Sequence, residues 1–151
     1  MIVSEGRIRT GIAPRDYKAR LIELQDLAVG WLDGHGLPPP PIVALWTRLT
    51  LDRLVKDGLE IPFIYPVEAG GFELEWPHPQ TSCETSLTVT LARNQYGLDD
   101  PYNVEIYGHA MNMLSQETAE AYFSQYQDGY QSLLLFLRWS KTFDVHEAAA
   151  Q

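Results

Sequence analysis

The clearest hydrophobic pattern in the chain lies between residues 61 and 76. Two short apolar segments flank the turn sequence Ala69-Gly70-Gly71. The second segment alternates between apolar and acidic side chains: Phe72, Glu73, Leu74, Glu75 and Trp76. Alternation with a period of two is typical of a strand with one buried face. The pattern therefore predicts a β-hairpin whose solvent-facing side carries Glu73 and Glu75.

Two helices are predicted before this hairpin. In residues 15–32 apolar side chains recur at spacings of three and four, which indicates an amphipathic helix ending at Gly34-His35-Gly36. The prolines at 38–41 exclude a helix, and we expect them to form a connector rather than a ligand for an aromatic groove. A second helix is predicted over residues 42–56, with an inner stripe of Leu45, Trp46, Leu49 and Val55 that Leu51 and Leu54 broaden.

The remaining pattern predicts more strands and a last helix. Pro62 and Pro66 place the strand over residues 61–65 at a sheet edge, because proline removes a ladder donor. Residues 84–91 and 102–107 alternate and predict two further strands, the latter with Tyr102, Val104 and Ile106 facing inward. Ser115 is a plausible N-cap for a long helix over residues 116–140, in which Gly129 would mark a kink or a close helix approach.

This order predicts a single α+β domain over residues 1–151. We expect two layers: a four-stranded antiparallel meander packed against two N-terminal helices and one long C-terminal helix. Residues 1–13 alternate weakly and suit either an edge strand or a loose arm, and residues 145–151 suit a frayed tail.

The net charge of the chain limits the kinds of molecule that it is expected to bind. The formal net charge is −9, which opposes direct binding to nucleic acid or to an anionic membrane, and suits a protein partner with a basic surface. The alternative is that the acidity only keeps a small protein soluble. No apolar run approaches the roughly 20 residues that cross a bilayer, and the first residues lack a secretory pattern. We therefore expect a bacterial-type cytoplasmic protein. Whether it forms a homodimer by strand addition stays open.

The sequence offers few candidates for catalytic, metal-binding or cofactor-binding residues. The four histidines, at 35, 78, 109 and 146, match no zinc spacing, so we predict no metal site and no cofactor. Cys83 is the only cysteine, and we interpret it as a structural residue rather than a nucleophile. The sequence contains no glycine-rich phosphate-binding motif. One catalytic alternative remains, in which Glu73 and Glu75 converge with His78 and His109.

The aromatic content, 11% of the chain, suggests a binding surface because tyrosine and tryptophan are enriched at protein interfaces. The alternative is that most of these rings fill the core. Combined with the acidic positions, this gives seven candidate binding residues: Trp31, Tyr65, Glu73, Glu75, Trp76, Asp99 and Asp100. Asp99 and Asp100, which precede a proline, also fit ordinary turn chemistry.

Three segments carry a family resemblance: residues 30–36 (GWLDGHG), Tyr65-Pro66, and residues 70–76 (GGFELEW). Together they resemble a group of small uncharacterised bacterial proteins in which a GW-x-DG-x-G element precedes a YP…GG…LEW hairpin. The similarity covers about residues 24–76. It implies a bacterial or phage cytoplasmic origin and supplies no catalytic residues.

The leading hypothesis is a non-catalytic acidic interaction protein that binds and occludes a macromolecular partner. An antitoxin, an immunity or inhibitor protein, or a phage anti-defence factor such as an anti-CRISPR would fit. The alternatives are a small metal-dependent hydrolase and a small-ligand binding module with a pocket between sheet and helices.

Overall fold

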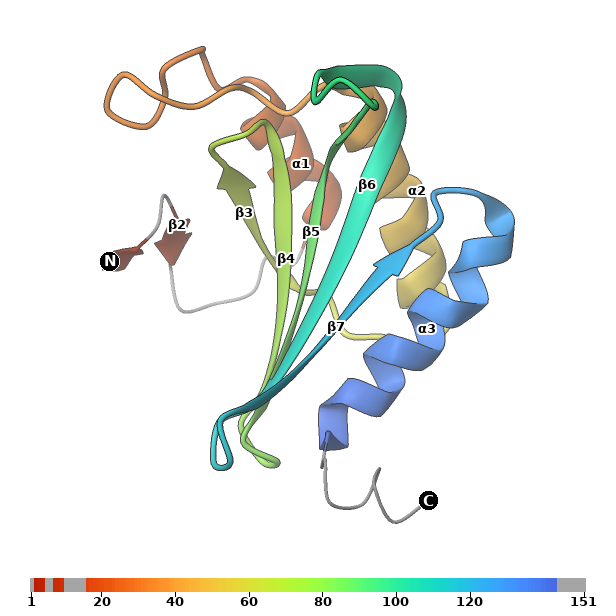
Figure 1. Cartoon of the computed structure of the whole chain (residues 1–151). Helices are drawn as coiled ribbons and strands as arrows, with labels where there is room; N and C mark the ends of the chain where they lie inside the picture. Colours follow the sequence, from red (N-terminus) through yellow and green to blue (C-terminus); the bar gives the residue numbers. More distant parts are fainter. Residues whose placement is uncertain (1, 5–6, 10–15, 144–151) are drawn as a thin grey trace.

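The structure, a computed structural model, describes residues 2–4, 7–9 and 16–143. Within these residues the strands and α-helices are β1 (Ile2–Ser4), β2 (Arg7–Arg9), α1 (Tyr17–Gln25), α2 (Pro41–Lys56), β3 (Phe63–Val67), β4 (Gly71–His78), β5 (Cys83–Arg93), β6 (Asp99–Asn112), β7 (Glu117–Phe123) and α3 (Tyr130–Trp139), and short 3-10 helices stand at Gln127–Gly129 and Ser140–Thr142. The main sheet is an antiparallel meander in the order β3-β4-β5-β6-β7, and β1 pairs with β2 in a separate hairpin (Figure 1).

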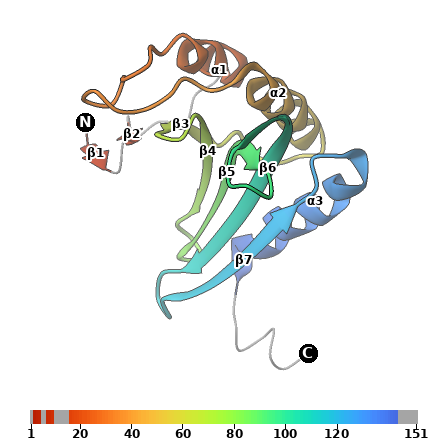
Figure 2. The same cartoon turned by 45° about the horizontal axis from the view of Figure 1, so that its top comes forward.

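The three α-helices cover one face of the main sheet, and the β1–β2 hairpin lies beside β3 at one edge (Figures 1 and 2). The predicted α+β fold is therefore confirmed. The core lies between sheet and helices, where fully buried side chains include Leu51, Phe72, Leu74, Leu87 and Ile106. The predicted edge position of the first strand is also confirmed, although β3 runs two residues later than expected.

The β3–β4 turn fits its sequence and supports the chain that precedes α2. Gly70 has φ +91°, a left-handed conformation that glycine adopts without steric cost, and its amide donates to the Val67 carbonyl. The amide of Leu37 donates to the Glu68 carbonyl at 3.0 Å, so the proline run lies against this turn. Pro41 then starts α2, where its missing N–H costs nothing. The proline run is thus a connector between α1 and α2.

Both N-terminal helices differ from their predictions. The helix α1 ends at Gln25, not near residue 32, because only Leu21 and Leu24 reach the core and Val29 is exposed. The helix α2 spans the predicted range, and Leu51 and Leu54 of the predicted stripe are buried, but Leu45 and Leu49 are exposed. Its buried residues are Val43, Ala44, Thr47, Leu51 and Leu54. No helix in the described part of the chain is long and apolar enough to cross a membrane.

The prediction of four strands and a long last helix is wrong: the sheet has a fifth strand, β7, and α3 has only ten residues. Residues 112–116 form a turn in which the Asn112 side chain accepts from the amides of Leu114 and Ser115. The chain then returns along β6. Gly129, expected in mid-helix, stands immediately before α3.

Other predictions fall outside the described residues or need a smaller correction. Residues 10–13, the tail over 145–151 and His146 lie outside the described ranges. Val104 and Ile106 face inward as predicted, but Tyr102 is 79% exposed. It stands at the outer end of the β5–β6 hairpin, beyond the irregular pairing between Leu91 and Arg93.

Candidate functional site

The sheet face opposite the helices carries an ordered array of polar and aromatic side chains. Strand register aligns them in two cross-strand rows: Tyr65, Glu73, Thr88, Tyr107 and Tyr122, and beside these Phe63, Glu75, Ser86, His109 and Glu120. None of the described helices lies on this side (Figure 2). We call the part of this side formed by β4 to β7 the open face.

The strands that form the open face are strongly acidic. Arg93 is the single basic residue of β4 to β7 other than histidine. The acidic residues of these strands are Glu73, Glu75, Glu84, Asp99, Asp100, Glu105, Glu117 and Glu120. The excess of negative charge in the whole chain is thus pronounced in the sheet, and it creates a negative potential there.

A tyrosine pair stands at the β6–β7 end of the open face. The rings of Tyr107 and Tyr122 are 5.2 Å apart between centroids and tilted by 51°. Burial raises the pKa of Tyr107, and its hydrogen bond to Glu120 raises it further. Tyr122 is 70% exposed. The pair therefore offers a fixed aromatic surface beside a carboxylate, an arrangement suited to contact with a cationic group.

A shallow depression of about 170 Å³ lies in the middle of the open face. It is lined by Glu73, Glu84, Ser86, His109 and Met111. Two of the four residues of the catalytic alternative, Glu73 and His109, are thus brought together. Glu75 lies on the same side of the sheet but is fully buried, so the prediction that it stands on a solvated face is wrong.

His78 lies on the other side of the sheet. Its Nε2 is 3.2 Å from the Thr85 hydroxyl, which donates to Ser140 at 2.6 Å. Burial lowers the pKa of His78, and nearby Lys141 lowers it further. The four residues of the catalytic alternative therefore do not converge. Nowhere in the described ranges do three His, Cys, Asp or Glu side chains lie close enough to hold a metal ion.

The seven candidate binding residues differ in the structure in their location and in their exposure to solvent. Tyr65, Glu75 and Trp76 are each at most 3% exposed and present almost no surface to a partner. The Trp76 indole donates to the Glu60 carbonyl at 2.8 Å, as expected of a core tryptophan. Only Glu73 stands at an accessible position of the open face.

The other three candidates lie in loops or at the sheet end. The Trp31 indole donates to the Leu37 carbonyl at 2.9 Å and packs on Gly36. The carboxylate of Asp100 accepts from the Asn103 side chain and from the Tyr102 amide, and these bonds lower its pKa. Asp99 pairs with Arg93 across the β5–β6 hairpin. The side chain of Asp100 thus serves the local chain geometry, as its sequence context suggested, whereas Asp99 is placed only by its register in the ladder.

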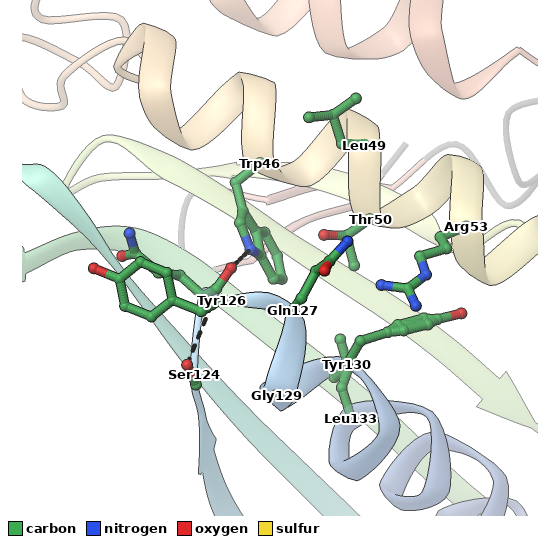
Figure 3. Close-up of a pocket in the computed structure, with 11 residues that line it drawn as sticks. Trp46, Leu49, Thr50, Arg53, Ser124, Tyr126, Gln127, Gly129, Tyr130 and Leu133 are labelled. Atoms are coloured by element: carbon green, nitrogen blue, oxygen red, sulfur yellow. Dashed lines mark hydrogen bonds between the residues drawn. The ribbon is translucent and has the colours of Figure 1, made fainter.

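A second concave site escaped the sequence analysis. It lies between α2 and the segment that joins β7 to α3, and has a volume of about 280 Å³ (Figure 3). We call it the α2 pocket. Trp46, Thr50 and Arg53 of α2 line it at spacings of four and three, opposite Tyr126, Gln127 and Tyr130. The helical spacing was visible in the sequence, but the opposing segment is some 80 residues away.

Tyrosine–carboxylate bonds join α2 to both other helices and predict an alkaline limit to stability. The hydroxyl of Tyr130 donates to Asp57 at 2.5 Å, and that of Tyr17 donates to Asp52. Burial, followed by the bond to Asp57, raises the pKa of Tyr130 from 10.0 to about 12. The bond to Asp52 raises that of Tyr17 to about 12 as well.

In both cases the folded protein keeps the proton to higher pH than the unfolded chain. The stability that these bonds contribute is present below about pH 10 and is lost as the pH rises towards about 12. We expect the double variant Y17F/Y130F to show a shallower decline across this window in denaturant titrations. Y96F, which alters an exposed loop tyrosine, serves as the control and should keep the wild-type profile. An unchanged profile in the double variant would contradict the assignment.

Comparison with protein-family models, curated proteins and solved structures finds no match for this chain.

Proposed function

We propose that this chain is a non-catalytic acidic interaction protein that binds a basic site on a macromolecular partner, most simply a protein, and occludes it. Antitoxins, immunity or inhibitor proteins and phage anti-defence factors such as anti-CRISPRs work in this way. The observation that carries the proposal is the open face: an antiparallel sheet whose uncovered side combines carboxylates with a tyrosine pair, of which Tyr122 is exposed.

The open face has the physical properties that such binding needs. Its side chains project from paired strands, so little conformational entropy is lost when a partner orders them. Tyrosines supply large contact areas, and residues of this kind often dominate binding energy. The negative potential of the strands would steer a basic partner during encounter.

The test is capture of a partner by the immobilised full chain from a bacterial host lysate treated with nuclease. We expect one stoichiometric protein, bound more weakly at physiological than at low salt, because the screening length falls from about 30 Å to about 8 Å. The variant E120Q/Y122A should reduce affinity at least tenfold, the effect of losing an interface hot spot. Both side chains are exposed, so the fold should survive.

A matched control separates the open face from general effects of composition. The variant E68Q/Y96A makes the same two changes at exposed loop positions outside the open face and should bind as the wild type does. Equal binding by both double variants, or a loss of binding in both, would contradict the assignment of the open face. Capture that disappears with nuclease treatment would instead indicate a nucleic-acid bridge and overturn the proposal of a protein partner.

A further inference from the structure

The α2 pocket contains a cation in a strongly acidic chain. Arg53 is the only charged side chain among the residues that line it, and its guanidinium carbon lies 3.7 Å from the centroid of the Tyr130 ring (Figure 3). Arg53 forms no ion pair with any residue in the described ranges. Asp57, four residues further along the chain, accepts from the Tyr130 hydroxyl. The N–H donors of Arg53 are therefore available to an anion.

The opposite end of the pocket is aromatic. Figure 3 shows Trp46 and Tyr126 on one side of Gln127, and Arg53 and Tyr130 on the other. The Trp46 indole donates to the Gln125 carbonyl at 3.1 Å, which fixes its orientation. Tyr126 is 65% exposed although it stands beside this cavity. A flat apolar group could lie against these rings while remaining connected to an anion at Arg53.

The pocket is preorganised by bonds that do not involve a ligand. The Gln125 side chain accepts from the Val104 amide at 2.5 Å, which ties the segment to β6. The Tyr126 amide donates to the Ser124 hydroxyl at 3.2 Å. Gly129 approaches Ser124 so closely that a Cβ at this position would lie 2.4 Å from the Ser124 carbonyl oxygen. Little rearrangement is needed before binding, which favours affinity.

We propose that the α2 pocket binds a small aryl carboxylate, with the aromatic ring against Trp46 and Tyr126 and the carboxylate on the Arg53 guanidinium. The volume of 280 Å³ equals that of roughly nine waters at about 30 Å³ each, which suits one ring with a short chain. Two sources share this chemistry: a free aryl-alkanoic acid and the C-terminal aromatic residue of a protein. The proposal is independent of the open face.

The experiment compares a carboxylate with its uncharged analogue on the full chain. The probes are 3-phenylpropionate and 3-phenylpropanamide, titrated while the indole N–H signals are followed by NMR. We expect the Trp46 signal, assigned with W46F, to shift. The carboxylate should bind about tenfold tighter than the amide, because hydrogen bonds to a charged acceptor are roughly twice as strong as neutral ones.

Substitutions test which pocket residue contacts the carboxylate of the ligand and which contacts its ring. R53Q should abolish the preference for the carboxylate, whereas K56Q, which removes the other basic residue in the last turn of α2, should keep it. Y126A should weaken the acid and the amide by the same factor, since it removes only a wall for the ring. Ala-Ala-Phe with a free C-terminus forms a second arm: tighter binding of this peptide identifies a protein C-terminus, and tighter binding of phenylpropionate identifies a free acid.

Several results would overturn the proposal. One is the lack of saturable binding by any of these probes at millimolar concentration. Others are equal affinity of the wild type for acid and amide, a carboxylate preference that persists in R53Q, and shifts that spare the Trp46 signal.

Discussion

Replacing Gly71 by alanine is expected to lower the free energy of unfolding by about 3 kcal/mol, or roughly 6–12 °C in melting temperature. Gly71 is buried at the start of β4 and pairs with both β3 and β5. A Cβ built there would lie 2.0 Å from the carbonyl oxygen of Val89. Because that atom belongs to the backbone, no rotamer change relieves the clash. The strands must separate locally, and neighbouring ladder hydrogen bonds are then lost.

The matched control is Gly58→Ala, which follows the C-cap residue of α2. Gly58 has φ +94°, so alanine is strained there, but nothing lies within 4 Å of the added Cβ. That strain costs about 1–2 kcal/mol. Thermal or urea unfolding of the two variants therefore compares a steric clash with a purely conformational penalty. If Gly71→Ala proved no more destabilising than Gly58→Ala, the close β4–β5 approach at Gly71 would be wrong.

The hairpin around this glycine shows what local sequence can predict. Alternation at residues 72–76 identified a strand, and the buried Phe72, Leu74 and Trp76 confirm its inner face. The same alternation predicted that Glu75 is exposed on the outer face, and this prediction is wrong. In the sheet Glu75 lies between Phe63 of β3 and Ser86 of β5. Burial that depends on tertiary packing leaves no local signal, so a buried glutamate looks like a solvated one in the sequence.

Strand β7 was not predicted for a different reason. In β7 the residues Ala119, Tyr122 and Phe123 also fit a helical spacing, and the period of two is weak because its apolar side consists partly of small alanines. Pairing with β6 decides in favour of the strand, and the Tyr107–Tyr122 contact is one result. Tertiary pairing thus overrides an ambiguous local preference.

The candidate sites also differ in how much of each could be predicted from the sequence. The acidic character of the open face follows from composition, and Glu73 was named from the sequence alone. The Tyr107–Tyr122 pair and the α2 pocket depend on register and on contacts between distant segments, such as the bond from Trp46 to Gln125. Composition can indicate the charge of a partner, whereas the positions that contact it emerge only from the fold.

Replacing Leu51 by alanine is the second change expected to have a large effect. Leu51 is 0% exposed on α2, where that helix packs against the sheet. Loss of a buried leucine side chain combines the transfer term with the cost of the cavity left behind, about 2–5 kcal/mol. For a domain of this size the melting temperature should fall by roughly 10 °C. Urea unfolding monitored by tryptophan fluorescence measures the change in free energy directly.

Leu45→Ala makes the same chemical change on the same helix at a side chain that is 55% exposed. It should change the free energy of unfolding by less than about 0.5 kcal/mol, because little apolar area is lost and alanine has the higher helix propensity. The pair also decides which stripe of α2 faces the core. The sequence pattern placed Leu45 in the inner stripe and Leu51 at a position that broadens it, whereas the structure exposes Leu45 and buries Leu51. If Leu45→Ala were the more destabilising variant, α2 would have to be rotated about its axis, and the pocket that depends on Trp46 and Arg53 would no longer exist in the form described.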